Sequence, residues 1–246
     1  MSKPEWYNSW FESPWYMRLY RHRTDEEARE AISIVSDLVG TPPGARVLDL
    51  CCGYGRHAMA LAEGGYQVTG LDNSVYLIDR AREVYPHENV EYIVGDMRGP
   101  FPGAPYHTIA NFFTSFGYFD SHTENLRVLE AVRSALVDSG TFVLDFLNAT
   151  RLRHTLEPET ITMFDGVTVV QERWIDNPFV HKRITITNPC SYELEYDERV
   201  WLYDRQELEA LFREAGITPK ATFGNYDGSA FNATESPRCI LVGTAT

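Results

Sequence analysis

Short apolar stretches alternate with helical patterns over residues 46–146, and this alternation restricts the fold more than any other feature of the chain. Strands are expected over residues 46–50, 67–71, 90–94, 107–113 and 141–146. Helices are expected over residues 56–63 and 75–84 and after the capping-box pattern at 121–124. Strands and helices that alternate with short links favour a mostly parallel, doubly wound sheet.

The pattern changes between residues 150 and 203, where turn signals separate three further strand-like stretches. Antiparallel strands are expected there over residues 167–174, 181–187 and 192–202. Helices are expected at 26–39 and after the capping-box pattern at 204–207, and two closing strands at 217–223 and 239–242. The fold class is therefore α/β, a doubly wound seven-stranded sheet with an antiparallel β insertion after strand five.

The composition of the chain narrows the classes of function that it can have. The 246 residues, 43% of them hydrophobic, suffice for the core of one domain with an insertion. The 35 acidic residues outnumber the 22 basic ones, and the net charge of −13 opposes binding to the phosphate backbone of nucleic acids. The sequence shows neither a signal-peptide pattern nor an apolar run of bilayer length, so we expect a cytoplasmic protein without a membrane partner.

The cysteines and histidines do not have the spacing of metal ligands. Cys51, Cys52, Cys190 and Cys239 form no CxxC pair, and the seven histidines lack pairs three or four residues apart. We therefore expect reduced thiols and no bound metal.

A glycine-containing turn follows the first expected strand, in the sequence from Asp49 through Gly53 and Gly55. Such a turn lets a ligand approach backbone amides at a helix N-terminus, and an acid at the end of the next strand, Asp72, suits a ribose. A dinucleotide would place a pyrophosphate at this turn, whereas S-adenosylmethionine would place an ammonium and a sulfonium there. The carboxylate of Asp49 repels the first and attracts the second, and Cys51 replaces the glycine usual in dinucleotide turns.

Two further stretches follow the third and fourth expected strands. Asp96 can accept a hydrogen bond from an adenine amino group, and Met97 offers an apolar surface to the ring. Residues 111–118 follow strand four, where the reacting groups of such a sheet are held. Each acid could instead be an ordinary turn or helix-cap residue, but their order along successive strands favours a binding site.

These motifs resemble the class I S-adenosylmethionine-dependent methyltransferases, on residues 47–57, 68–74, 95–98 and 114–118. Within that family the chain is similar to the small-molecule group with an antiparallel insertion after strand five, which includes sugar N-methyltransferases and glycine or sarcosine methyltransferases. The resemblance implies a Rossmann-like sheet and S-adenosylmethionine as cofactor, with S-adenosylhomocysteine as product. It also implies a division into an N-terminal aromatic segment that covers the cofactor (1–40), a cofactor-binding core (41–149), a substrate cap (150–203) and a C-terminal completion of the core (204–246).

The family's cofactor contacts transfer to matching positions of this chain. They assign the methionine portion to Asp49, Gly53 and Gly55, the ribose hydroxyls to Asp72, the adenine to Asp96 and Met97, and a place beside the methionine and sulfonium to Asn111. Cys51 and Asn73 are further candidate cofactor contacts. Cys51 and Cys52 depart from the family, which more often has alanine or glycine there.

Seven aromatic residues fall within the first twenty positions, and the family folds such a segment over its cofactor. Tyr16 and Tyr20 lie one helical turn apart and can face a sulfonium, to which an aromatic ring is attracted. Arg23 can pair with the methionine carboxylate. The alternative is that the segment only packs against the sheet.

The expected acceptor is a small polar molecule with an amine or hydroxyl nucleophile, methylated by in-line transfer. We expect its pocket between residues 114–119, the aromatic segment and the insertion. Tyr118 and His181 are the candidate catalytic residues, and Tyr118 can orient a nucleophile or relay its proton. Candidate substrate contacts are His181, Arg183, Arg199 and Trp201, of which strand alternation lets about half face inward.

Three other functions remain open at this point: a tRNA or rRNA methyltransferase, a nicotinamide-dependent oxidoreductase, and a non-catalytic nucleotide-binding module. The net charge disfavours the first, and Asp49 disfavours the second. The protein is expected to act as a monomer or homodimer.

Overall fold

The computed structural model describes residues 5–164, 166–188 and 192–246 of the chain. Its main element is a seven-stranded sheet with the order β10-β11-β5-β4-β1-β2-β3. The strands are β1 (Arg46–Leu50), β2 (Gln67–Asp72), β3 (Val90–Val94), β4 (Tyr106–Asn111), β5 (Leu136–Leu147), β10 (Ile217–Phe223) and β11 (Arg238–Ala245). The first five strands run parallel, and β11 is antiparallel to both of its neighbours.

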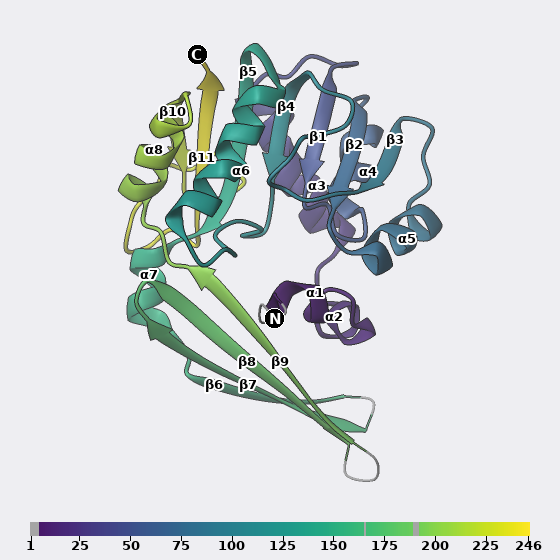
Figure 1. Cartoon of the computed structure of the whole chain (residues 1–246), viewed down its shortest axis with the longest axis vertical. Helices are drawn as coiled ribbons and strands as arrows, with labels where there is room; N and C mark the ends of the chain where they lie inside the picture. The colour runs from purple at the N-terminus through teal and green to yellow at the C-terminus, as the bar shows by residue number, and fades with distance from the viewer. Residues whose placement is uncertain (1–4, 165, 189–191) are drawn as a thin grey trace.

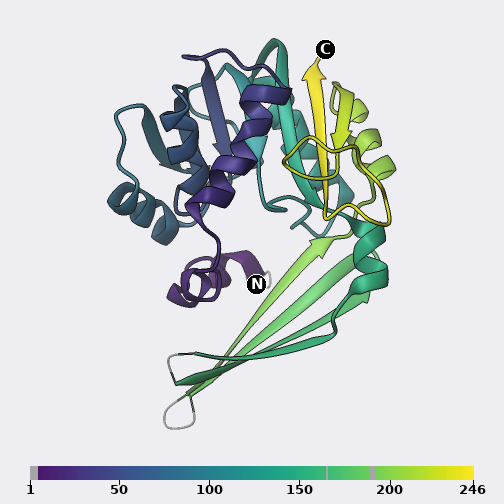
Figure 2. The same ribbon diagram turned by 180° about the vertical axis from the view of Figure 1, so that it is seen from behind.

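Helices cover both faces of this sheet (Figures 1 and 2). One face packs against α6 (His122–Ala135) and α8 (Arg205–Glu214). The other packs against α3 (Asp25–Ser33), its π-helical continuation η1 (Ile34–Leu38), α4 (Arg56–Glu63) and α5 (Val75–Val84). The predicted doubly wound fold with seven strands is confirmed.

The chain order of the strands reverses beside β1, which lies between β2 and β4. Open α/β sheets bind ligands outside the carboxyl ends of their strands at such a reversal. The loops after β1, β2, β3 and β4 all meet at this edge, so the fold places the predicted motif residues together.

The antiparallel insertion is a separate four-stranded sheet that extends from one end of the main sheet (Figure 1). Its order is β6 (Glu159–Phe164), β7 (Val167–Asp176), β8 (Phe179–Asn188) and β9 (Tyr192–Trp201), and it is preceded by the helix α7 (Ala149–Thr155). The sequence missed β6 and α7. Strand β6 lies at the edge of its sheet with Ile161 and Met163 61% and 79% exposed, so it lacks the buried alternate positions that reveal a strand.

The N-terminal segment forms two short helices, α1 (Trp6–Trp10) and α2 (Pro14–Leu19), between the main sheet and the insertion (Figures 1 and 2). Ser13 caps α2 through its hydroxyl, and Pro14 occupies the first helical position, where its missing N–H costs nothing. The side chain of Trp10 is fully buried against the insertion, where Val169, Ile184 and Ile186 surround it.

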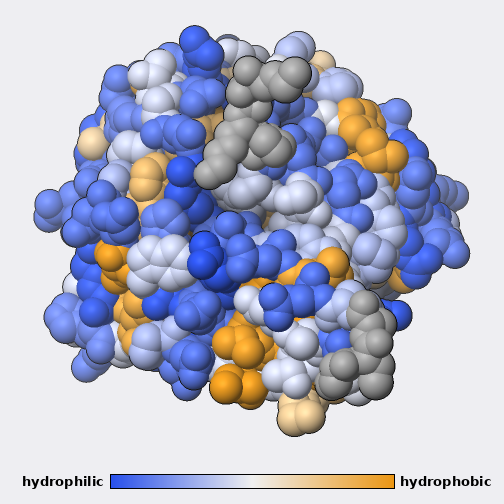
Figure 3. Space-filling model, turned by 60° about the horizontal axis from the view of Figure 1, so that its bottom comes forward, coloured by the Kyte–Doolittle hydropathy of each residue, from blue (hydrophilic) through white to orange (hydrophobic). Residues whose placement is uncertain are grey.

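The surface on the insertion side is mostly hydrophilic, with separate hydrophobic patches (Figure 3). Among the described residues, no helix is long and apolar enough to cross a membrane. Of the four cysteines, Cys51, Cys52 and Cys239 are free thiols, and Cys190 lies outside the described residues.

Candidate functional site

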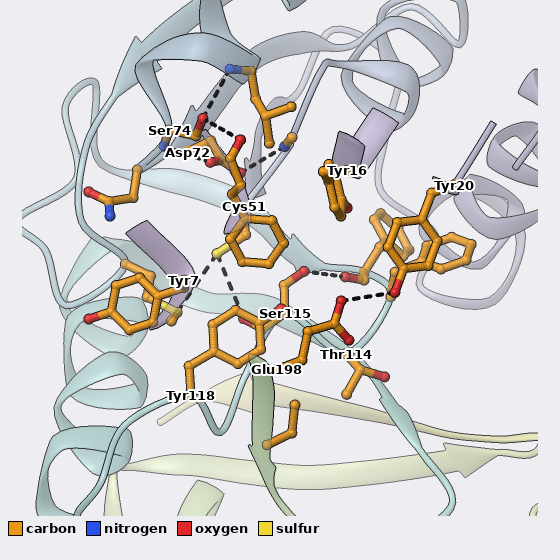
Figure 4. Close-up of a pocket in the computed structure, with 18 of the residues that line it drawn as sticks. Tyr7, Tyr16, Tyr20, Cys51, Asp72, Ser74, Thr114, Ser115, Tyr118 and Glu198 are labelled. Atoms are coloured by element: carbon orange, nitrogen blue, oxygen red, sulfur yellow. Dashed lines mark hydrogen bonds between the residues drawn. The ribbon is translucent and has the colours of Figure 1, made fainter. Parts of the chain in front are cut away.

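A cavity of about 370 Å³ lies at the carboxyl edge of the main sheet, between it, the N-terminal helices and the insertion. Figure 4 shows Tyr16 and Tyr20 on one side of this cavity, Tyr7 and Tyr118 on the other, and Cys51 between them. Eleven of the fourteen predicted site residues line it. They are Tyr16, Tyr20, Arg23, Cys51, Gly53, Asp72, Asn73, Asp96, Met97, Tyr118 and His181.

The turn after β1 is built on backbone that side chains rarely adopt. Gly53 and Gly55 have φ values of 55° and 95°, and a Cβ on Gly55 would lie 2.6 Å from the hydroxyl oxygen of Tyr92. Cys51 has a φ of 63° although it carries a side chain, which explains why a smaller residue is usual there. Gly55 itself does not line the cavity; it shapes the turn that does.

Asp72 ends β2 and anchors this turn. Its carboxylate accepts hydrogen bonds from the backbone N–H of Gly53 and of Ser74, both at 2.9 Å. Burial raises the pKa of Asp72, and the backbone donors oppose that rise. The neighbouring Asn73 reaches the N-terminal helices through a 2.9 Å hydrogen bond to Asn8. The acid therefore lines the cavity beside the N-terminal helices.

Two predicted residues lie beneath the turn and do not line the cavity. Asp49 and Asn111 are each 1% exposed. One oxygen of each, Oδ2 of Asp49 and Oδ1 of Asn111, is buried without a hydrogen-bond partner. Burial, together with the charge of Asp72, raises the pKa of Asp49 to about 7. Two orphaned acceptors under one turn suit a hydrogen-bond donor or a cation bound above them.

Asp96 follows β3 and is held by Arg98. The guanidinium of Arg98 donates to both carboxylate oxygens of Asp96, with a shortest distance of 2.6 Å. Burial favours the neutral acid, but these bonds outweigh it and hold the pKa of Asp96 below its usual range. Met97 lies beside Cys51, with 3.7 Å between their sulfur atoms, so the apolar surface expected next to Asp96 is present.

Tyr118 stands in an aromatic wall that the N-terminal helices complete. Its ring centroid lies 4.9 Å from that of Trp6, 6.0 Å from Phe11 and 6.2 Å from Tyr7. Burial raises the pKa of the Tyr118 phenol well above its ordinary value. The phenol is thus a hydrogen-bonding group that keeps its proton at neutral pH. The sequence placed the aromatic segment beside residues 114–119 but did not name these three rings as neighbours of Tyr118.

Tyr20 and Arg23 lie on the opposite side. The hydroxyl of Tyr20 donates to Glu198 at 2.9 Å and accepts a hydrogen bond from Lys182, and burial raises the pKa of this phenol. The guanidinium carbon of Arg23 lies 4.2 Å from the ring centroid of Tyr20 and 4.7 Å from that of Phe113. Tyr16 packs against Tyr20 and Phe11 with centroid separations of 5.0 Å each.

The register of the insertion decides which of its side chains face the cavity. His181 lies directly opposite Trp174 and Arg199, and its ring stacks on Trp174 at 5.0 Å. Lys182 lies directly opposite Arg173 and Glu198, and all three line the cavity. Successive residues of a strand point to opposite faces, so the two rows lie on different faces of the sheet.

This register corrects three of the expected substrate contacts. Arg183 pairs with Asp197, Arg199 pairs with Asp120, and Trp201 stacks on Tyr203; none of the three lines the cavity. His181 lines it, with a pKa lowered by burial, but shares the face of Trp174. The residues that the sequence reasoning missed are Arg173, Lys182 and Glu198. Leu194 and Tyr196 of β9 contact the buried cluster around Trp10, and continuing this alternation would have identified Glu198.

Strained backbone conformations are concentrated around the cavity. Of the four residues other than glycine with positive φ in the described chain, Cys51, Phe113 and Thr114 line the cavity. Such conformations persist where the surroundings enforce them, often at ligand sites. The described residues contain no group of three or more His, Cys, Asp or Glu side chains that could hold a metal ion.

Comparison with known proteins shows a similarity to methyltransferases. Residues 47–140 match the family model described as a methyltransferase domain. A dTDP-3-amino-3,4,6-trideoxy-alpha-D-glucopyranose N,N-dimethyltransferase of Streptomyces venezuelae is 28% identical over 225 residues, which cover 87% of this chain and 92% of the relative.

Two solved structures share the fold over nearly the whole chain. The CcbJ methyltransferase of Streptomyces caelestis matches with a TM-score of 0.77 at 22% identity, over 91% of this chain and 99% of that one. CalS10, an amino pentose methyltransferase of Micromonospora echinaspora solved with bound S-adenosylmethionine, matches with a TM-score of 0.72 at 21% identity, over 95% and 98%. Residues 47–140 therefore form a methyltransferase domain, and the chain around it has the fold of the S-adenosylmethionine-dependent methyltransferases, as the sequence predicted.

Proposed function

We propose that this methyltransferase transfers the methyl group of S-adenosylmethionine to the amine nitrogen of a small polar molecule. The observation that carries the proposal is the cavity at the carboxyl edge of the sheet, with Asp49, Asp72 and Asp96 at the ends of three successive strands. Bound S-adenosylmethionine supplies an electrophilic methyl group on its sulfonium. The residues of this chain bind, orient and shield it.

The residues around the turn fit this cofactor. A carboxylate at Asp72 can accept both ribose hydroxyls, and the Asp96 carboxylate with Met97 can hold the adenine. The orphaned oxygens of Asp49 and Asn111 offer acceptors and negative charge to the ammonium above the turn. Arg23, which has no carboxylate within 4.0 Å among the described residues, can pair with the methionine carboxylate.

The aromatic rings on both sides of the cavity have two tasks in this proposal. Trp6, Phe11 and Tyr16 exclude water from the cavity, and their ring faces attract a sulfonium by about 1 kcal/mol in a partly exposed site. Tyr118 keeps its proton, so its hydroxyl orients the nucleophile without acting as a base. His181 lines the cavity and remains a candidate base, and its lowered pKa keeps it unprotonated at neutral pH.

Support for an amine acceptor comes from the relatives, which are named as methyltransferases of amino sugars. The whole-chain likeness includes the insertion, which supplies one wall of the acceptor side of the cavity. The rRNA methyltransferases among the relatives match at most 28% of this chain, and the net charge of −13 opposes an RNA acceptor.

Two measurements test the proposal. S-adenosylhomocysteine should raise the melting temperature in differential scanning fluorimetry, whereas NAD should not. Methyl transfer from labelled S-adenosylmethionine to a small-molecule extract, and none to bulk tRNA, should then distinguish a small-molecule methyltransferase from the RNA-modifying and non-catalytic alternatives. Stabilisation by NAD alone, or label appearing only in tRNA, would overturn the proposal.

A further inference from the structure

Five cationic side chains form a continuous wall along one side of the cavity, and we call this wall the basic arc. Its members come from the segment after α2, the start of α4, β7, β8 and the start of β11. They are Arg23, Arg56, Arg173, Lys182 and Arg238, all of which line the cavity. Such a gathering stands out in a protein with a net charge of −13.

Two aromatic rings connect the members of the arc. The guanidinium carbons of Arg23, Arg238 and Arg56 lie 4.7, 5.2 and 5.6 Å from the ring centroid of Phe113. Arg23 and the Lys182 Nζ lie 4.2 and 4.9 Å from the ring centroid of Tyr20. Arg173 continues the arc as the direct cross-strand neighbour of Lys182.

Three members of the arc are neutralised by acids. Arg238 pairs with the buried Asp145, Lys182 pairs with Glu198 at 3.2 Å, and Arg56 has Glu27 at 3.9 Å. The other two, Arg23 and Arg173, have no carboxylate within 4.0 Å in the part of the chain that the structure describes. Charged groups removed from water are normally paired with an opposite charge, so we expect each of these two guanidiniums to bind an anion.

The cofactor accounts for one of these anions. S-adenosylmethionine carries a single carboxylate, and Arg23, next to the turn after β1, is the partner proposed for it. Arg173 lies on β7 of the insertion, where only neutral acceptors hold it. Its Nη1 donates to Thr160 Oγ1 at 3.1 Å and its Nη2 to Gln171 Oε1 at 2.9 Å.

We propose that the acceptor amine also carries an acidic group, a carboxylate or a phosphate, and that Arg173 binds this group. The inference rests on the function proposed above and names the chemical class of the acceptor. An apolar wall from β5, α7 and the residue after it, β8 and β9 receives the body of the molecule. The apolar residues that line this wall are Leu147, Leu152, Leu156, Val180 and Val200.

The charge of the methylated product tests the inference. The whole protein is incubated with methyl-labelled S-adenosylmethionine and a small-molecule extract, and the products are passed over an anion-exchange resin at a pH at which amines are neutral. We expect the labelled product to be retained. A labelled product that passes through would overturn the inference and leave the proposed methyltransferase intact, whereas the absence of any labelled product would count against the proposed function itself.

The same product shows whether the acidic group is a phosphate or a carboxylate. Treatment with phosphodiesterase and phosphatase should abolish retention if the acid is a phosphate and leave it unchanged if the acid is a carboxylate. Both results agree with the proposal, because Arg173 can bind either group through two N–H donors.

Variants of Arg173 test the role of this residue, with the acceptor purified from the extract as the substrate. Arg173→Gln should raise KM for the acceptor at least tenfold with little change in kcat and none in S-adenosylhomocysteine affinity, and Arg173→Lys should recover part of the loss. The matched control is Arg153→Gln, because Arg153 is exposed on α7, bonds only to Asn177 among the described residues and does not line the cavity. An unchanged KM in a folded Arg173→Gln protein would overturn the assignment.

Discussion

The indole N–H of Trp10 donates to the carboxylate of Glu198 at 2.6 Å, although the two residues lie 188 positions apart in the chain. The same carboxylate accepts the hydroxyl of Tyr20 and pairs with Lys182. Trp10 is fully buried, and the side chain of Glu198 is 20% exposed. One acid of β9 thus fastens both N-terminal helices to the insertion and joins two walls of the cavity.

Replacing Glu198 should lower the free energy of unfolding. Glu198→Ala removes the carboxylate that pairs with the Trp10 N–H and the Lys182 ammonium, and breaking such a buried pair costs about 3 kcal/mol. We expect a loss of this size in the free energy of unfolding, measured by urea denaturation with tryptophan fluorescence. Glu198→Gln keeps an acceptor for Trp10 and should lose less. Equal stability of Glu198→Ala and the natural protein would contradict this account.

Asp72→Ala should weaken S-adenosylhomocysteine binding by roughly 2–3 kcal/mol, because a pair of hydrogen bonds to a charged group is lost. The substitution also frees the N–H of Gly53, which Asp72 holds at 2.9 Å. Asp72→Asn separates these effects, since its amide oxygen can still accept that N–H. Isothermal titration gives both affinities, and a change of less than twofold in Asp72→Ala would refute the ribose assignment.

Cofactor affinity should fall as the pH is lowered through about 7. Asp49 is buried with a pKa of about 7, so it is ionised above that pH and attracts an ammonium, whereas below it the acid is neutral and the attraction is lost. Between pH 8 and pH 6 the dissociation constant of S-adenosylhomocysteine should rise by up to about tenfold. In Asp49→Asn the affinity should be weak and nearly independent of pH over this range; a pH dependence retained in that variant would assign it to another group.

Once an acceptor is in hand, Tyr118→Phe should reduce turnover at least tenfold and leave S-adenosylhomocysteine affinity unchanged. The hydroxyl orients the nucleophile but keeps its proton, because burial raises its pKa. The shape of the pH–rate profile should therefore be the same in both proteins. Natural turnover in the variant would assign Tyr118 to packing against Trp6 and Phe11, and an altered profile would make it a proton-transfer group.

The main sheet could be predicted because its signals are local. Helices α4 and α5 begin and end where the sequence placed them, since a glycine turn or a capping serine precedes each and apolar residues recur at helical spacing. The acids that line the cavity followed from the same reasoning, because the carboxyl ends of parallel strands meet at one edge. Asp72 and Asp96 both line the cavity there.

The part of the cavity proposed to bind the acceptor could not be predicted from the sequence in the same way, because its geometry depends on contacts between distant segments. Which face of the insertion points inward is decided by the docking of Trp10 against Val169 and Ile184, not by the strands alone. Arg199 and Trp201 were therefore expected as substrate contacts, whereas the buried positions of Leu194 and Tyr196 put Glu198 on the inner face of β9. The pairing of Tyr20 with Glu198 has no sequence signal at all.

The insertion forms a sheet with its own buried cluster and exchanges no strand with the main sheet. Substitutions on its inner face can therefore alter the shape and charge of the acceptor side while the hydrogen-bond ladder beneath the cofactor stays intact. For protein engineering, this makes β7, β8 and β9 the part of the chain in which to build a library for new acceptors.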